Sequence, residues 1–398
     1  MSKIITDENK IDEVLSRGVE ELISRDSLEK KLKSGRKLRI KLGIDPTSPN
    51  IHIGRSIPIL KLRDFQNLGH QVVFIVGDFT GVIGDTSDKE SERPMLSKET
   101  IKKNMKGYIK QAGKILSLSK CEFYYNSKWL GKLKYEDIGE QADSFSLSDF
   151  ISRDNIKRRL NAGTRVSLRE VLYPLMQGYD SVAIKADIEI GGMDQKFNLL
   201  AGRKLQERFK QIPQDIIMNP LILGTDGRKM SSSWGNVINL KEEPSNMYGK
   251  VMSLADNLII QYFKLTTRVS MDEINKYEDK LKNGENPKNI KMQLAKELVK
   301  MYHSEKQAKE AQENWEKTFS KKEIPEDVQE IKKNKDELLV DVLLKSKIIS
   351  SKNEFRRLVK ENAITNLDTN EKIKEVDNEV IPGVYRIGKK RFCKIILN

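Results

Sequence analysis

The stretch LRIKLGIDPTSPNIHIGR, residues 38–55, decides the fold that the sequence predicts. Apolar and basic residues alternate over 38–42, which is typical of a β-strand, and the strand stops at the turn formers of 43–47. A helix is predicted from about residue 52 to 68, and the apolar run over 72–76 indicates a buried parallel strand. Strand, helix and strand in this order indicate a parallel sheet with crossover helices.

The remainder of the chain continues this alternation. We expect an amphipathic helical lead-in over 1–35, a helix over 97–116, strands over 122–125, 182–190 and 216–223, and mostly helices over 247–315. Ligands of open α/β sheets bind at the carboxyl ends of the strands, where the loops 45–52 and 78–93 fall.

Length and composition limit the architecture. The 398 residues exceed a typical single domain and predict two or three. The predicted fold class is α/β, with a parallel-sheet domain over 1–240, a helical domain over 241–320, a charged linker over 321–335 and a compact α+β unit over 336–398.

The charge balance is strongly basic. A formal net charge of +14 favours a polyanionic partner, nucleic acid first and an acidic membrane second. Lysines that fill ordinary solvated helix faces are the alternative explanation. Cys121 and Cys393 are the only cysteines, too few for a disulfide framework or a zinc site and typical of a reducing cytoplasm. Without a signal-peptide core or an apolar membrane span, we expect a soluble cytoplasmic protein that does not enter a membrane.

Two short strings carry candidate chemistry. The first, HIGR at residues 52–55, follows a turn and opens a helix, where backbone N–H groups and the positive dipole end suit a phosphate. Thr47 and His52 are placed to hydrogen-bond an α-phosphate, and Gly54 allows a nucleotide to approach the backbone. A helix-start histidine without a ligand is the alternative, and the string alone does not exclude it.

The second string, KMSSS at residues 229–233, lies in a polar, Gly-rich segment. A mobile loop that carries Arg228 and Lys229 suits a departing pyrophosphate, because phosphoryl-type transfer depends on positioning and charge neutralisation. A solvated surface turn is the alternative. The two strings support each other, since one fits the nucleotide and the other fits its triphosphate.

Common catalytic sets are missing from the sequence. His70 and His303 read as structural, and no Ser/His/Asp set, metal cluster or P-loop is found. Activation of a carboxylate by ATP requires no enzyme nucleophile, because the substrate carboxylate itself attacks the α-phosphate. Orientation and electrostatic stabilisation then supply the catalysis.

Further strings make a family resemblance specific. They are GDFTG at 77–81, IGD at 83–85, YPLMQGYD at 173–180 and GGMDQ at 191–195. Together with the first two strings, they resemble bacterial tyrosyl-tRNA synthetases, class I enzymes whose HIGH and KMSKS motifs correspond to 52–55 and 229–233. The similarity runs across essentially the whole chain and is greatest to the subgroup with Lys at the position of Lys41, where many relatives have a phenol-sensing Tyr.

The resemblance implies a Rossmann-like catalytic domain with a dimer-forming insertion, and it implies site residues by position. Catalysis involves Thr47, His52, Lys89, Arg93, Lys229, Ser231 and Ser232. ATP contacts Asp45, His52, Gly54, Arg55, Gly192, Asp194, Lys229, Met230 and Ser232. Tyrosine contacts Lys41, Gly43, Asp45, Asp85, Asn126, Tyr173, Gln177, Asp180 and Gln195, with Trp129 nearby and Asp180 accepting the hydrogen bond from the phenol. No resident metal is implied, and Mg²⁺ arrives with the nucleotide.

One helical face carries Tyr173, Gln177 and Asp180, because their spacing is i, i+4, i+7. Such polar faces are usually solvated, but the apolar residues around Asp180 favour a buried site. Asp85 in its Gly-rich turn has an alternative role as a turn residue.

Three departures from the family pattern concern the site. Arg55 replaces the second His of the first motif and is a candidate for a contact to the ribose or a phosphate of ATP. Ser232 replaces the second Lys of the other motif. Lys41 replaces the phenol-sensing Tyr, and its ammonium is expected to pair with Asp180.

The C-terminal unit has a basic face and an apolar side. The basic residues are Lys345, Lys347, Lys352, Arg356, Arg357 and Lys360. Such a face suits contacts to a phosphate backbone, and the unit resembles the small RNA-binding fold of a ribosomal small-subunit protein. A solvated Lys-rich helix is the alternative.

The resemblance therefore implies a homodimeric tyrosine-tRNA ligase. Its substrates are ATP, L-tyrosine and tRNA(Tyr), with transfer of tyrosine to the 3′-terminal adenosine. A tryptophanyl-tRNA synthetase and a synthetase-like RNA-binding cofactor without activity remain as alternatives.

Overall fold

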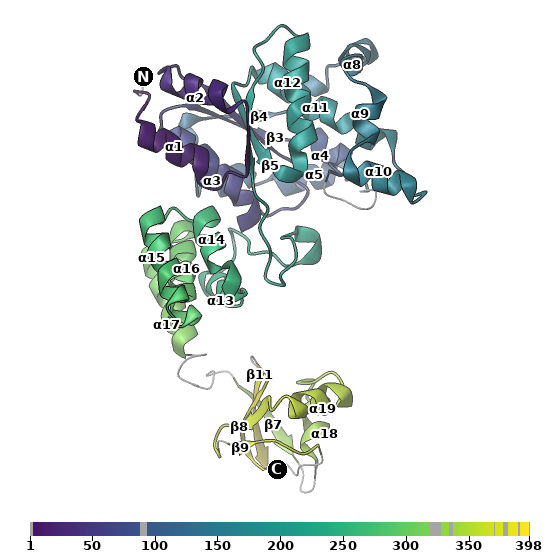
Figure 1. Ribbon diagram of the computed structural model, residues 1–398. Coiled ribbons are helices and arrows are strands. Elements are labelled where there is room, and N and C mark those ends of the chain that lie inside the picture. The colour runs from purple at the N-terminus through teal and green to yellow at the C-terminus, as the bar shows by residue number, and fades with distance from the viewer. Residues whose placement is uncertain are drawn as a thin grey trace. The chain divides into compact units, whose positions relative to one another are not determined.

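The computed structural model describes residues 3–87, 94–317, 328–333, 337–369, 371–376, 381–388 and 391–397. The chain forms two compact units, Met1–Gln312 and Glu313–Asn398 (Figure 1).

A six-stranded sheet in the order β1-β6-β5-β2-β3-β4 forms the centre of the first unit. The strands are β1 (Glu21–Ile23), β2 (Arg39–Ile44), β3 (Gln71–Val76), β4 (Cys121–Tyr125), β5 (Ile188–Gly192) and β6 (Asp215–Asn219). All neighbours run parallel except β1, which pairs antiparallel with β6. The predicted parallel α/β sheet is thus confirmed, with one antiparallel strand added at its edge.

Helices cover both faces of this sheet, with α3 on one face and α11 and α12 on the other (Figure 1). The α-helices before β5 are α1 (Glu8–Ser16), α2 (Arg25–Lys33), α3 (Ile53–Asn67), α4 (Thr80–Ile83), α5 (Lys98–Met105), α6 (Tyr108–Ala112), α7 (Ser127–Leu130), α8 (Tyr135–Ala142), α9 (Leu147–Ile151), α10 (Asp154–Asn161) and α11 (Leu168–Ile184). The α-helix α12 (Lys196–Arg208) joins β5 to β6, and short 3₁₀ turns are η1 (Leu118–Lys120), η2 (Met193–Gln195) and η3 (Ser232–Trp234).

Three element predictions in this unit are wrong in detail. The helix expected over 97–116 breaks into α5 and α6 at Gly107, whose φ of 97° is left-handed backbone that glycine adopts without strain. The strand expected over 182–190 begins only at Ile188, because α11 continues to Ile184 with Val182 and Ile184 packed in the core. The lead-in over 1–35 contains β1 as well as two helices.

Helices follow residue 243, as the sequence predicts for 247–315. They are α13 (Pro244–Met252), η4 (Asp256–Leu258), α14 (Ile259–Thr266), α15 (Met271–Lys282), α16 (Pro287–Tyr302) and α17 (Glu305–Trp315). These helices belong to the first unit, except for the last three residues of α17. Arg17 donates to the carbonyls of Phe263 and Thr267, and Arg268 pairs with Asp64 at 2.8 Å. These bonds tie α14 and the residues after it to the first part of the chain.

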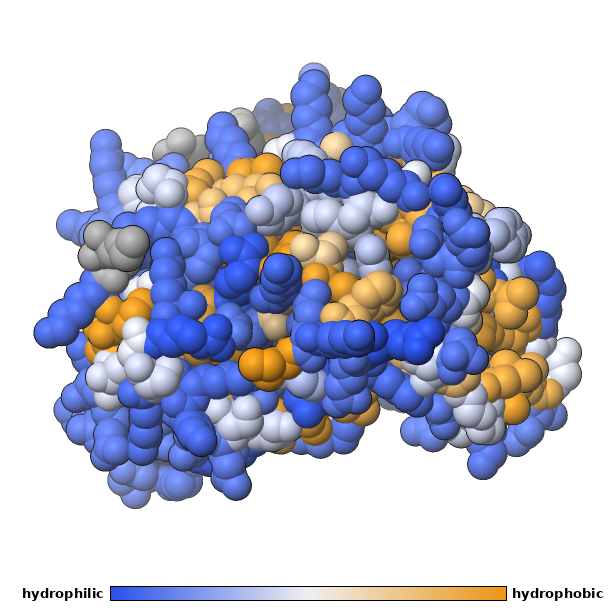
Figure 2. Space-filling view, turned by 90° about the horizontal axis from the view of Figure 1, so that it is seen from above, coloured by the Kyte–Doolittle hydropathy of each residue, from blue (hydrophilic) through white to orange (hydrophobic). Residues whose placement is uncertain are grey.

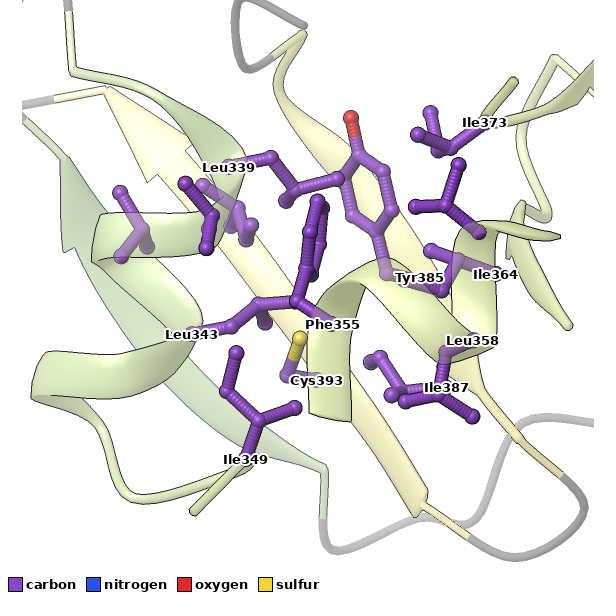
Figure 3. Packing of buried hydrophobic residues seen from close by; sticks show 14 residues of the cluster. Leu339, Leu343, Ile349, Phe355, Leu358, Ile364, Ile373, Tyr385, Ile387 and Cys393 are labelled. Carbon is purple, nitrogen blue, oxygen red and sulfur yellow. The ribbon is translucent and has the colours of Figure 1, made fainter. Parts of the chain in front are cut away.

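The second unit is a five-stranded sheet with two helices on one face. The strands are β7 (Gln329–Lys333), β8 (Ile364–Asn366), β9 (Glu371–Lys372), β10 (Gly383–Ile387) and β11 (Arg391–Leu397), and the helices are α18 (Leu339–Lys345) and α19 (Lys352–Lys360). Its core packs Phe355 of α19 and Leu343 of α18 against Tyr385 and Cys393 of the sheet (Figure 3).

Strand β7 lies inside the range 321–335 that the sequence assigns to a linker. It pairs in parallel with β11, from Gln329 opposite Cys393 to Lys333 opposite Leu397. Ladder hydrogen bonds therefore place residues 329–333 in the C-terminal sheet, which corrects that part of the linker prediction.

Candidate active site

A cavity of about 420 Å³ opens at the carboxyl ends of the parallel strands. β2 lies between β3 and β5, so the chain winds outward from β2 to β4 and then crosses to the other side of β2. This reversal of strand order leaves a crevice between β2 and β5, which is where open α/β sheets bind ligands. Residues just past β2, β3, β4, β5 and β6 all line the cavity.

The cavity brings together most of the residues that the sequence assigns to the site. They are Gly43, Asp45, Thr47, His52, Gly54, Arg55, Asp85, Asn126, Tyr173, Gln177, Asp180, Gly192, Asp194, Gln195, Lys229, Met230, Ser231 and Ser232. Lys41 does not line it, and Lys89 and Arg93 lie outside the described residues.

His52 caps the N-terminus of α3. Its Nδ1 accepts a hydrogen bond from the Arg55 backbone N–H at 3.3 Å, and the side chain is 6% exposed. Burial, with the positive charge of Arg55 beside it, lowers the pKa of His52 to about 3. The ring is therefore neutral at physiological pH and carries its proton on Nε2, so it is a hydrogen-bond donor without a charge.

Arg55 fastens the turn before α3. Its guanidinium donates to the Asp45 carbonyl at 3.3 Å, to Thr47 Oγ1 at 2.9 Å and to the Tyr108 hydroxyl at 3.1 Å. The Tyr108 hydroxyl in turn donates to the Ser48 carbonyl at 2.7 Å. All of these acceptors are uncharged oxygens, so the guanidinium brings its positive charge into the cavity while it holds the turn in place.

Asp45 is the first carboxylate of the cavity. Its Oδ2 accepts from the Tyr173 hydroxyl at 2.8 Å, and its Oδ1 accepts from Thr80 Oγ1 at 2.7 Å. Burial raises the pKa of Asp45 to about 6, against the opposing effect of these two hydrogen bonds. The group is still mostly ionised at neutral pH, and it fixes Tyr173 of α11 to the end of β2.

Asp180 is the second buried carboxylate, and it is held by two donors. Trp129 Nε1 donates to its Oδ1 at 2.7 Å, and Asn126 Nδ2 donates to its Oδ2 at 3.2 Å. Burial raises the pKa of Asp180 to about 7, while the charge of Lys41 and the two hydrogen bonds oppose that rise. An ionised carboxylate has about four lone-pair positions, so two acceptor positions remain for a hydroxyl in the cavity.

Lys41 does not pair with Asp180, which corrects the sequence-based expectation. Its ammonium lies 2.8 Å from Glu189 Oε1, donates to Ser181 Oγ at 2.7 Å and donates to the Gln177 carbonyl at 2.9 Å. The parallel register sets Lys41 of β2 directly beside Glu189 of β5. A carboxylate on the neighbouring strand therefore takes the ion pair, and Lys41 stays fully buried behind the cavity wall.

Asp85 ends the turn after α4 and faces α12. Its Oδ1 accepts from the backbone N–H and the hydroxyl of Ser87, at 2.9 and 2.6 Å, which is the turn role that the sequence left open. Its Oδ2 is 3.4 Å from Asn198 Nδ2, and Asn198 also donates to Gln177 Oε1 at 3.1 Å. Asp85 thus combines a turn bond with a place in the cavity wall.

The second motif meets the first across the cavity. Lys229 Nζ lies 3.0 Å from Asp194 Oδ2, and the Gly54 backbone N–H donates to the sulfur of Met230 at 3.3 Å. The side-chain amide of Asn236 ties the segment together by accepting from the Ser231 N–H at 2.8 Å and donating to the Lys229 carbonyl at 3.0 Å.

Several residues of this network carry no motif signal. Glu189, Asn198 and Tyr108 each bond a residue that lines the cavity. Ser181 bonds Lys41 and Glu189 behind it. A charged residue inside the apolar strand IEIGG was the one signal available for Glu189, because a buried strand position seldom carries an unpaired charge.

Two other kinds of feature are absent from the described residues. Within the described ranges, no three or more His, Cys, Asp or Glu side chains group closely enough to hold a metal ion. None of the helices described is both long and apolar enough to cross a membrane.

Comparison with known proteins agrees with the geometry. A family model described as tRNA synthetases class I (W and Y) matches residues 33–320. The tyrosine–tRNA ligase of Thermotoga maritima is 43% identical over 387 residues, which cover 96% of both chains. That of Dehalococcoides mccartyi strain CBDB1 is 43% identical over 98% of this chain and 99% of the relative.

Solved structures share the fold. The C-terminally truncated mitochondrial tyrosyl-tRNA synthetase of Aspergillus nidulans gives a TM-score of 0.67 at 20% identity, covering 79% of this chain and 95% of that chain. The tyrosyl-tRNA synthetase of Archaeoglobus fulgidus, complexed with L-tyrosine, gives 0.62 at 21% identity, covering 76% and 99%. With the near full-length identity to the curated relatives, the chain belongs to the tyrosine–tRNA ligases, enzymes of the class I aminoacyl-tRNA synthetase family.

Proposed function

We propose that the cavity activates L-tyrosine with ATP and then passes the tyrosyl group to the 3′-terminal adenosine of tRNA(Tyr). The observation that carries this proposal is Asp180, a buried carboxylate with two donors and two remaining acceptor positions, in the same cavity as both nucleotide motifs. A buried acceptor of this kind favours an amino acid that brings a hydroxyl, because an analogue without it leaves the acceptor unpaired.

In the first step, a tyrosine carboxylate oxygen attacks the α-phosphorus. The new O–P bond forms as the bond to pyrophosphate breaks, so no side chain becomes covalently attached. Neutral His52 donates from Nε2 to the α-phosphate with Thr47 beside it, and Lys229 neutralises the leaving pyrophosphate. We assign the same neutralising role to Lys89 and Arg93. Ser231 and Ser232, which follow Lys229 in the second motif, are also assigned to the nucleotide.

The amino acid and the nucleotide occupy different walls of the cavity. The ammonium and carboxylate of tyrosine are assigned to Asp85, Tyr173, Gln177 and Gln195, with Gly43 and Asp45 behind them. The ATP ribose is assigned to Gly192 and Asp194, and its phosphates to Gly54, Arg55 and Met230. Mg²⁺ is expected to arrive bound to the nucleotide phosphates, which is its usual mode of binding in such sites.

Amino-acid-dependent ATP–pyrophosphate exchange tests the proposal, with tyrosine, phenylalanine and tryptophan measured in parallel. We expect exchange with tyrosine and little with the other two. Exchange driven by tryptophan overturns the choice of amino acid. An absence of exchange with all three, by protein that is folded, overturns amino-acid activation and leaves the RNA-binding cofactor.

The C-terminal unit is assigned to tRNA binding. All six basic residues named for it are exposed, although Lys345 lies 2.5 Å from Glu337 and Lys352 lies 3.0 Å from Asp341. Arg356, Arg357 and Lys360 lie on α19, whose buried residues face the core instead (Figure 3). An exposed cationic helix face suits contacts to phosphates, which lose affinity as salt increases.

A charge-matched pair of variants tests this role in the full-length chain. Arg356→Gln/Arg357→Gln/Lys360→Gln is expected to raise KM for tRNA and to reduce the slope of its salt dependence by about one for each phosphate that is no longer bound. The control, Lys276→Gln/Lys280→Gln/Lys282→Gln on α15, removes the same charge elsewhere. Equal KM values for tRNA in the two variants overturn the assignment, and exchange with tyrosine stays unchanged in both.

A homodimer is proposed from an exposed apolar surface on α8–α11. Tyr135, Leu147, Ile151, Leu160 and Leu168 are 94, 66, 39, 46 and 69% exposed. Figure 2 shows orange side chains among the blue ones on the right, the side on which α8–α10 lie in Figure 1. Exposed apolar side chains gathered on one side of a protein favour an interface, and a second copy is the occupant we propose.

Light scattering on the purified protein measures the oligomeric state. Leu168→Glu should give a monomer, whereas Ile212→Glu, at a residue 78% exposed outside these helices, should leave the dimer intact. A monomeric wild-type protein overturns the proposal. We place the enzyme in the cytoplasm, which agrees with the free thiols of Cys121 and Cys393.

A further inference from the structure

Behind the wall of the cavity lies a buried ion pair for which the proposed chemistry has no direct use. Lys41 and Glu189 are 0% and 1% exposed, and neither lines the cavity. Each makes as many hydrogen bonds as it can, so the pair has no capacity left for a substrate.

The Lys41 ammonium has three N–H groups and three acceptors: Glu189, Ser181 and the Gln177 carbonyl. Its capacity is used within the protein. Lys41 therefore does not donate to the substrate phenol, although its position in the family pattern suggests that it does.

Glu189 has four lone-pair positions and four donors. Its Oε1 accepts from Lys41 and from Gln177 Nε2, at 2.8 and 3.2 Å, and its Oε2 accepts from Ser181 Oγ and Gln214 Nε2, at 3.0 and 2.5 Å. An ionised carboxylate accepts hydrogen bonds and donates none, so the Gln177 side chain must turn its NH₂ group toward Glu189.

The opposite end of the Gln177 amide is set as well. Its Oε1 accepts from Asn198 Nδ2 at 3.1 Å, and Asn198 reaches Asp85 at 3.4 Å. One amide N–H of Gln177 and one lone pair of its oxygen remain, and both belong to a side chain that lines the cavity. The directions of this N–H and this lone pair are set by Glu189, because its buried negative charge holds the NH₂ end of the Gln177 amide.

We propose that Glu189, neutralised by Lys41, is a positioning residue that orients the Gln177 amide toward the amino-acid substrate without touching it. This inference rests on the proposed tyrosine activation and assigns a substrate-positioning role to a residue outside the site. Lys41 also ties α11 to β2 through the Gln177 carbonyl and Ser181.

Glu189→Gln is the direct test, because it keeps the shape of the side chain but replaces one acceptor oxygen with an NH₂ group that donates hydrogen bonds. The Gln177 amide can then adopt either orientation. We expect KM for tyrosine in pyrophosphate exchange to rise about 3- to 10-fold, the worth of one neutral hydrogen bond. KM for ATP should stay within about twofold, since no ATP contact is altered.

Ser181→Ala is the matched control. It removes a hydroxyl that bonds both Lys41 and Glu189 but leaves the Glu189 bond to Gln177 in place. A purely structural network predicts that both variants lower the melting temperature and leave KM for tyrosine unchanged. The positioning role predicts that only Glu189→Gln moves KM for tyrosine.

The outcomes separate this inference from the proposed function. If wild-type protein exchanges pyrophosphate with tyrosine and Glu189→Gln has the wild-type KM, the positioning role is wrong while the proposed function stands. If Glu189→Gln fails to fold, Lys41→Met/Glu189→Gln removes both buried charges together. The same rise in KM is expected from that double variant, and an unchanged KM overturns the inference.

Discussion

Replacing Asp180 by asparagine changes one oxygen of the buried carboxylate into an NH₂ group. The remaining oxygen is expected to stay with Trp129, the closer donor at 2.7 Å, so the new NH₂ group faces Asn126 Nδ2. Asn126 cannot turn over to accept from it. Its Oδ1 accepts from the Phe79 N–H at 3.0 Å, and its Nδ2 donates to Thr80 Oγ1 at 2.9 Å. The variant therefore loses the anionic acceptor for the phenol.

The size of the effect follows from the type of bond. A hydrogen bond to a charged group contributes about 1.5–3 kcal/mol. At about 1.4 kcal/mol per factor of ten, kcat/KM for tyrosine should fall about 10- to 150-fold. Phenylalanine makes no such bond, and it no longer has to desolvate a charge, so its kcat/KM should stay constant or rise. The ratio of the two values should fall at least about tenfold.

The assay is pyrophosphate exchange with both amino acids at pH 8, above the pKa of about 7 of Asp180. Asp78→Asn is the control, because Asp78 bonds Ser127 outside the cavity lining. In wild-type protein the ratio of kcat/KM for tyrosine to that for phenylalanine should also decline as the pH falls below 7, because the Asp180 carboxyl takes up a proton. In Asp180→Asn this ratio should not vary with pH. An unchanged ratio, or an equal loss for both amino acids, refutes the assigned role.

Three other substitutions test separate parts of the molecule. Lys229→Met should lower kcat for exchange about 10²-fold, as for other charge-stabilising donors. Arg228→Gln should not, because Arg228 pairs with Asp226 at 2.6 Å and does not line the cavity, contrary to the role that the sequence suggested for it. Arg55→Ala should raise KM for ATP about tenfold with KM for tyrosine unchanged; the reverse pattern would contradict its assignment to the nucleotide. Burial lowers the pKa of Lys61 from 10.5 to about 8, so the unfolded chain binds more protons between these values. The contribution of Lys61 to the unfolding free energy should therefore rise by up to about 3 kcal/mol from pH 8 to 10.5. It is measured as the change with pH in the difference between wild type and Lys61→Met in urea titrations.

The position of the cavity was predictable from the sequence. Strands that alternate with helices form a parallel sheet, and its carboxyl ends carry the loops with Asp45 and Asp85. The spacing of Tyr173, Gln177 and Asp180 predicted one helix face, and α11 presents all three to the cavity. Local periodicity suffices for these features, because each depends on residues close together in the chain.

The partner of Lys41 was not predictable in the same way. Pairing Lys41 with Glu189 requires the register of two strands that are adjacent in the sheet but separated by α3, β3, β4 and α11 in the sequence. The sequence suggested Asp180 as the partner of Lys41, because both were assigned to the phenol. In the structure, the carboxylate paired with Lys41 is Glu189 on β5. The extension of α11 to Ile184 was missed because residues 182–184 form a short apolar run, and periodicity alone does not distinguish a strand from a buried helix in such a run.

The relation between the two nucleotide motifs also depends on long-range pairing. The Ile53 N–H donates to the Ile238 carbonyl at 2.8 Å, and the Leu240 N–H donates to the Ile51 carbonyl at 2.9 Å. These bonds join the segment that follows the second motif to both sides of His52, which itself bridges to Asn239. The base of the Lys229 loop is thus fixed to the first motif, and the positions of the α-phosphate donor and of the pyrophosphate cation are set by one ladder. Each motif alone predicts a phosphate contact, whereas this ladder holds both motifs at one cavity, as the proposed reaction requires.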